Sequence, residues 1–114
     1  MMNNNTSLNR IFAEYRASIP QKLELLETLI KEVKTAGSEE KMKELRLQVH
    51  KISGSAGMYG YTKAGEICKE FSLVLHRKTD TLNQSKTDPN WGNEFDDYIQ
   101  KIREGFLYDS TNTG

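Results

Sequence analysis

Apolar side chains recur at spacings of three and four residues through most of this 114-residue sequence, and this period limits the fold more than any other feature. Such spacing places side chains on one face of an α-helix, whereas a half-buried β-strand alternates at every second residue. A short stripe, Leu8 to Tyr15, precedes four longer ones, at Leu23–Val33, Met42–Ala56, Ala64–Leu75 and Trp91–Phe106. No strand pattern competes with these stripes, so the sequence predicts an all-α protein.

Local signals divide the stripes into separate helices. Ser18, followed by proline and Gln21, has the pattern of a capping box and predicts a helix start after the short first stripe. Gly37 is typical of a helix end, Ser38 of the next helix start, and Gly60 of a second end. With short connections between the segments, the prediction is an antiparallel four-helix bundle with an additional short N-terminal helix.

The length of the chain is that of a single domain. We expect a helical bundle over residues 7–109, a disordered, asparagine-rich lead at 1–6 and a flexible tail at 110–114. Thr62 is expected to cap the helix that follows Gly60. The broadest apolar stripes predict a core in which Trp91, Phe95, Ile99 and Phe106 pack against Leu26, Ile30, Val49 and Phe71.

Composition argues against several functions. Sixteen basic and sixteen acidic residues give zero formal charge, so we expect neither nucleic acid nor membrane as a partner. The sequence shows no apolar run of spanning length and no signal-peptide pattern, and we expect a cytoplasmic monomer. Cys68 lies in an apolar stripe and is expected to be a buried, inert thiol. Without a phosphate-binding glycine loop or a cluster of metal-ligating residues, we expect no cofactor and no metal.

His50 is the residue that points to chemistry. On a helical projection it lies about 120° from the centre of the apolar face of its own stripe, so its ring should be exposed. Lys43 and Arg46 precede it on neighbouring turns, and Gly54 and Gly57 follow it. Glycine within a helix costs about 1 kcal/mol relative to alanine, which suggests that the missing side chains allow another molecule to approach. A neutral imidazole is a nucleophile suited to phosphoryl groups.

The run from His50 to Gly60 resembles the motif of histidine-containing phosphotransfer (HPt) domains. His50 matches the phosphoacceptor of that motif, and the other matching positions are Ile52, Gly54, Ser55, Ala56 and Gly60. Ser53 stands where the family often has a lysine. The resemblance implies a helical bundle that acts as a phosphoryl carrier rather than an enzyme. It also implies that the partner is a response-regulator receiver domain, whose aspartate and bound Mg²⁺ do the catalysis, or a sensor histidine kinase.

The remaining candidate residues surround His50. Support for the phosphoryl group is expected from Arg46, in place of the missing lysine, and from Lys43, Lys51 and Ser53. Partner docking is expected at Leu47, Gly54, Gly57 and Met58, because the helical projection places the two apolar side chains 60° to 80° beyond the histidine. His76 is interpreted as a solvated histidine favoured by the C-terminal end of its helix.

Two alternatives to a phosphorelay intermediate stay open. The chain could be a helical adaptor without covalent chemistry, or the phosphoacceptor module of a chemotaxis-type kinase. An exposed His50 beside two glycines favours either phosphoryl-carrying interpretation over the adaptor. The sequence does not separate those two interpretations, and it does not identify the cognate kinase or regulator, the signal or the direction of transfer.

Overall fold

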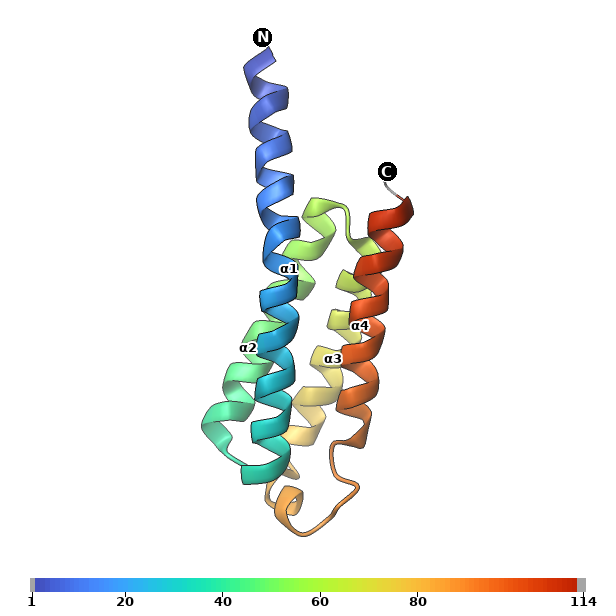
Figure 1. The fold of residues 1–114 in the computed structure, drawn as a ribbon. Helices are drawn as coiled ribbons and strands as arrows, with labels where there is room; N and C mark the ends of the chain where they lie inside the picture. The colour runs from blue at the N-terminus through green and yellow to red at the C-terminus, as the bar shows by residue number, and fades with distance from the viewer. Residues whose placement is uncertain (1, 113–114) are drawn as a thin grey trace.

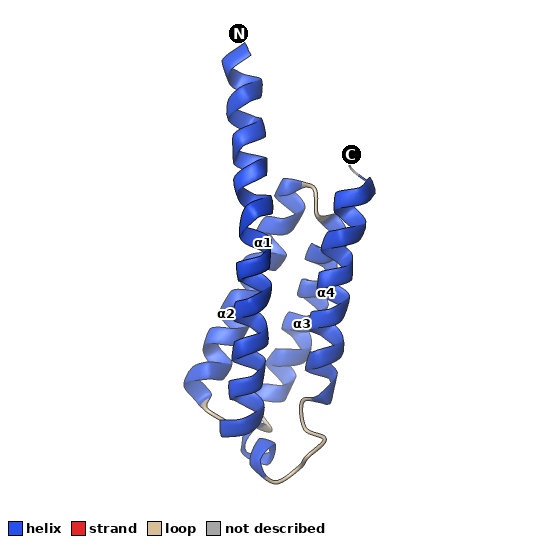
Figure 2. Ribbon diagram, viewed as in Figure 1, coloured by secondary structure: helices blue, strands red, loops and turns tan. Residues whose placement is uncertain are grey.

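The structure is a computed structural model that describes the backbone of residues 2–112 and the side chains of residues 7–110. This part of the chain forms four α-helices and no strand (Figure 1; Figure 2). The helices are α1 (Met2–Ala36), α2 (Glu39–Ser55), α3 (Thr62–Thr79) and α4 (Asn93–Asn112). Short 3-10 helices, η1 (Ala56–Tyr59) and η2 (Leu82–Lys86), lie in the connections after α2 and α3. The predicted all-α bundle is therefore confirmed.

The core lies between the four helices and contains all eight side chains expected there. Leu26 and Ile30 of α1, Val49 of α2, Phe71 of α3 and Phe95 of α4 are among its buried residues. The Phe71 and Phe95 rings lie 5.6 Å apart between centroids, at a distance typical of favourable aromatic pairs. The stripes read from the sequence are thus the faces that the bundle buries.

The separate short N-terminal helix expected from the sequence is absent, because α1 runs without a break through Pro20. Ser18 does not cap a helix start. Its hydroxyl donates to the backbone oxygen of Tyr15 at 2.6 Å. Pro20 is exposed, while Tyr15, Ile19 and Leu23 are buried at a spacing of four and continue one apolar face across the proline. Burial of this continuous face outweighs the local start signal.

The first turns of α1 project beyond the end of the bundle (Figure 1). The base of this projection is anchored by aromatic contacts, in which the Tyr15 ring stacks on Tyr59 of η1 at 4.1 Å. The Tyr15 hydroxyl also lies 3.1 Å from the Ser55 hydroxyl at the end of α2.

The expected lead at 1–6 and tail at 110–114 stay predictions, because the side chains of 1–6 and 111–114 lie outside the described residues.

The start of α3 is capped from another helix. Thr62, the expected cap, is instead the first residue of α3, and Tyr61 precedes it without a capping side-chain bond. Asp109 of α4 takes this role, since its carboxylate accepts from the backbone N–H groups of Lys63 at 3.0 Å and Ala64 at 3.2 Å. Close packing of α4 on α3 brings the carboxylate there: a Cβ on Gly105 would lie 3.1 Å from the Ala64 backbone.

We expect Asp109→Ala to lower the free energy of unfolding by about 1 to 3 kcal/mol, because it removes the acceptor of two N–H groups at the start of α3, of which that of Ala64 is buried. Urea denaturation followed by circular dichroism would measure the change. Asp97→Ala is the matched control, since Asp97 is an exposed aspartate on the same helix. Equal stability of the two variants would show that the interhelical cap contributes nothing.

Candidate functional site

The α-helix that carries His50 begins where its sequence predicts, but it ends at Ser55, before the expected end at Gly60. The Ser38 hydroxyl accepts from the backbone N–H of Lys41 at 3.3 Å, which caps α2 at its start. At the other end the chain tightens into η1 and stops at Gly60, whose φ of 88° is the left-handed conformation that favours glycine. Within α2 the buried residues are Met42, Leu45, Val49 and Ile52, so His50 lies on the exposed side of the helix.

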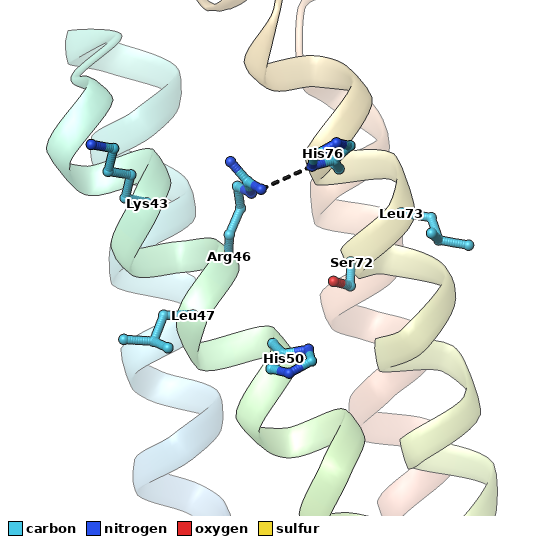
Figure 3. A pocket seen from close by; sticks show the side chains of 7 residues that line it. All are labelled: Lys43, Arg46, Leu47, His50, Ser72, Leu73 and His76. Carbon is cyan, nitrogen blue, oxygen red and sulfur yellow. Dashed lines mark hydrogen bonds between the residues drawn. The ribbon is translucent and has the colours of Figure 1, made fainter.

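Helix α3 runs antiparallel to α2, and its register is indicated by one contact with α2 and one with η1, directly after α2. Arg46 hydrogen-bonds His76 at 2.8 Å, and a Cβ on Gly65 would lie 3.5 Å from the backbone nitrogen of Gly57. In antiparallel helices a step of four residues forward on one is matched by four residues backward on the other. His50 is one turn after Arg46 and Ser72 one turn before His76, so His50 faces Ser72 across the groove (Figure 3).

The surface between these helices is a shallow groove around the histidine. It is lined by Lys43, Arg46, Leu47 and His50 from α2 and by Ser72, Leu73 and His76 from α3 (Figure 3). Two of these side chains are cations and none of the lining residues is acidic. The groove is therefore suited to an anion, because nothing in its lining repels one.

Of the four residues expected to support a phosphoryl group, only two line the groove. Lys43 and Arg46 line the groove with His50, whereas Lys51 is exposed outside its lining. The Ser53 hydroxyl donates to the backbone oxygen of His50 at 2.7 Å, so its proton is engaged within the helix. The Arg46 guanidinium is directed toward His76 (Figure 3).

The expected docking residues are divided between two surfaces. Leu47 lines the groove and is 46% exposed, but Met58 lies in η1 and lines a different hollow with Phe12 and Arg16 of α1. The helical projection assumed 100° per residue, and this fails for Met58 because the α-helix ends at Ser55 and the chain tightens into a 3-10 turn.

Gly54 and Gly57 both leave open space. A Cβ built on either glycine would meet nothing within 4 Å outside its own stretch of chain. In contrast, a Cβ on Gly105 would lie 3.1 Å from the Ala64 backbone, which explains the absence of a side chain there, and a Cβ on Gly65 would be in ordinary van der Waals contact with Ala56 and Gly57. Internal packing does not account for Gly54 and Gly57, so the surface beside His50 is open to another molecule.

Sequence reasoning missed Ser72 and Leu73 and interpreted His76 only as a solvated residue. These three come from α3, and their distance from His50 in the sequence hides their position opposite it. The available signal is the four-residue spacing of Ser72 and His76, which places them on one face of the helix. That spacing does not indicate which surface the face lines.

The thiol of Cys68 is fully buried, as the sequence predicts. Burial raises its pKa to about 12, so the thiol is protonated at neutral pH. Over the described residues, no group of three or more histidine, cysteine, aspartate or glutamate side chains is arranged to hold a metal ion. None of the helices found there is both long and apolar enough to cross a membrane.

The fold and the groove define a helical bundle that presents His50 from the exposed side of α2, with His76 of α3 in the same groove. The family model described as Hpt domain matches residues 10–105, and the chain therefore belongs to the Hpt-domain family. Members of this family are phosphotransfer modules of two-component signalling and act as phosphoryl carriers that interact with receiver domains or kinases. No curated protein and no solved structure shows a significant match to this sequence.

Proposed function

We propose that His50 accepts and donates the phosphoryl group of this module, in exchange with the aspartate of a response-regulator receiver domain. The observation that carries the proposal is an exposed imidazole in a groove lined by Lys43 and Arg46 and by no acidic residue. A phosphoryl group adds negative charge, and nearby cations favour it through Coulombic attraction and charge-assisted hydrogen bonds.

In the accepting direction, a ring nitrogen of His50 attacks the phosphorus of the aspartyl phosphate of the receiver. A nitrogen–phosphorus bond forms while the bond between the phosphorus and the carboxylate oxygen breaks, and the aspartate leaves with the bonding electrons. The proton on the other ring nitrogen is released to solvent. The donating direction is the reverse of these steps, and it regenerates the neutral imidazole.

The domain supplies the acceptor and the contact surface, and the receiver supplies the catalytic aspartate and its Mg²⁺. Within the groove, Arg46 and Lys43 are the residues best placed to support the phosphoryl group. Lys51 and Ser53 are weaker candidates. Lys51 lies outside the groove lining, and the Ser53 hydroxyl already donates a hydrogen bond to the backbone oxygen of His50.

Incubation with a panel of receiver domains that carry a radiolabelled phosphoryl group tests this function. We expect at least one receiver to transfer an acid-labile, base-stable label to this chain, which is the stability of phosphohistidine. The same receivers with the chain omitted give the background of spontaneous loss. If no receiver exchanges label with the chain in either direction, the phosphorelay proposal fails and the result favours the adaptor interpretation.

The apolar residues beside the groove are proposed to contact the receiver. Leu47 on α2 and Leu73 on α3 are both exposed and both line the groove that contains His50. Solvent-exposed apolar side chains around a reactive group are typical of a protein contact surface. Met58 belongs to this surface only if the partner also covers the end of the bundle.

We expect Leu47→Ala to weaken binding of a cognate receiver about fivefold, equivalent to ~1 kcal/mol of lost apolar contact, without moving the phosphorylation site. Titration calorimetry would measure the dissociation constant. Leu25→Ala is the matched control, because Leu25 is 41% exposed on α1, close to the 46% of Leu47, but does not line the groove. Equal affinities for the two variants would remove Leu47 from the contact surface.

A further inference from the structure

The contact between Arg46 and His76 fixes the protonation of the second histidine in the groove. A terminal nitrogen of the Arg46 guanidinium lies 2.8 Å from Nδ1 of His76. A guanidinium has only donors, so Nδ1 must be the acceptor. An imidazole that accepts at Nδ1 is neutral and carries its proton on Nε2. In this state a ring nitrogen of His76 accepts a hydrogen bond from Arg46, the cation expected to support a phosphoryl group on His50.

Arg46 can reach either histidine. It lies one helical turn before His50 on α2, where side chains four residues apart have Cβ atoms about 5 to 6 Å from each other. His76 is the partner it bonds in this structure, and no other hydrogen bond or ion pair of Arg46 is found in the described part of the chain. The guanidinium is directed along the groove toward α3 and away from the His50 ring (Figure 3).

The partner that Arg46 favours depends on whether His50 is phosphorylated. Without a phosphoryl group, His50 presents no negative charge, and a neutral Nδ1 on His76 is a good acceptor for the guanidinium. With a phosphoryl group on His50, a charged acceptor lies one turn from Arg46, and hydrogen bonds between two charged groups are stronger than those to a neutral acceptor. Phosphorylation should therefore attract Arg46 away from His76.

We propose that His76 is a positioning residue that holds Arg46 away from His50 until His50 is phosphorylated. This inference rests on the proposed function. The Arg46–His76 bond stabilises the unphosphorylated state only, because Arg46 must leave it to contact the phosphoryl group. The pair thus lowers the share of phosphohistidine at equilibrium, which favours passing the group on to a receiver.

The test is the equilibrium between phosphorylated receiver and phosphorylated chain, measured for a double-mutant cycle. His76→Ala should raise the ratio of phosphorylated to free His50 about two- to tenfold, the range that corresponds to one net hydrogen bond. His76→Asn should return the ratio toward that of the natural sequence, since its side-chain oxygen can accept from Arg46. Arg46→Ala alone should lower the ratio.

The cycle separates an effect through Arg46 from a change of groove shape. In the Arg46→Ala background, His76→Ala should have no effect. Lys43→Ala is the matched background, because it also removes a cation from the groove but leaves the Arg46–His76 bond, so the full effect of His76→Ala should persist there. Nitrogen NMR provides a second readout: the Nδ1 resonance of His76 should shift when His50 is phosphorylated and stay unchanged in His50→Gln treated alike.

Each outcome has one meaning. A ratio that is unchanged or lowered in His76→Ala, or an increase that persists without Arg46, overturns the positioning role. An Nδ1 resonance that does not respond to phosphorylation of His50 also overturns it. If the natural sequence takes no label at all from any receiver, the proposed function fails and this inference falls with it.

Discussion

His50→Gln is expected to abolish phosphoryl acceptance and to leave the bundle folded. In the proposed function the imidazole is the nucleophile, and a glutamine amide has no nitrogen lone pair of comparable reactivity, so the label on the chain should fall to background. His50 is exposed, so the free energy of unfolding should change by no more than about 0.5 kcal/mol. Label transfer from a phosphorylated receiver and urea denaturation would measure the two quantities.

His76→Gln is the matched control for this experiment. It removes the second imidazole of the same groove and introduces the same side chain. We expect it to keep an acid-labile label on His50. Label retained by His50→Gln and lost by His76→Gln would move the phosphoacceptor to α3, and the proposed role of His50 would be wrong.

Gly54→Gln is expected to slow phosphoryl transfer by about a hundredfold or more while α2 remains helical. In-line transfer needs the nitrogen and phosphorus in close approach, and a displacement of about 1 Å can cost a factor of that size. Gly54 lies one turn after His50, and its Cβ position faces open space, so a glutamine there extends over the surface that we expect the partner to cover. Rapid-quench measurement of transfer from a phosphorylated receiver would give the rate.

Two controls separate steric exclusion from changes in the helix. Gly54→Ala should transfer at nearly the natural rate, because a single methyl group meets nothing within 4 Å and alanine favours the helix by about 1 kcal/mol. Glu40→Gln introduces glutamine at an exposed position near the start of the same helix and should also transfer normally. Normal kinetics in Gly54→Gln would mean that the partner approaches His50 from another side.

The departure of this chain from the family motif is informative beside the structure. Ser53 replaces the lysine often found in the family three residues after the acceptor histidine, and its hydroxyl donates a hydrogen bond to the backbone oxygen of His50. In our proposal, cationic support for a phosphoryl group comes from Arg46, one turn before His50 in the same groove. The hydrogen bond from Arg46 to His76 would make that support conditional, which a lysine without such a partner would not be.

Much of the fold could be predicted because its causes are local. The Ser38 cap and the left-handed Gly60 follow from backbone requirements that a few neighbouring residues satisfy. Local reasoning failed at Pro20 and at Thr62. There, burial of a continuous face of α1 and a carboxylate from α4 took precedence over the nearby start signals.

The sequence by itself determined the all-α fold, its buried faces and the candidate histidine, because a period of 3.6 residues fixes which side chains share a face. The tertiary structure alone decided what stands opposite that histidine. Ser72, Leu73 and His76 reach the groove through the antiparallel register of α3 on α2. That register depends on packing between the helices, including the contact at Gly65, and no spacing within a single helix encodes it.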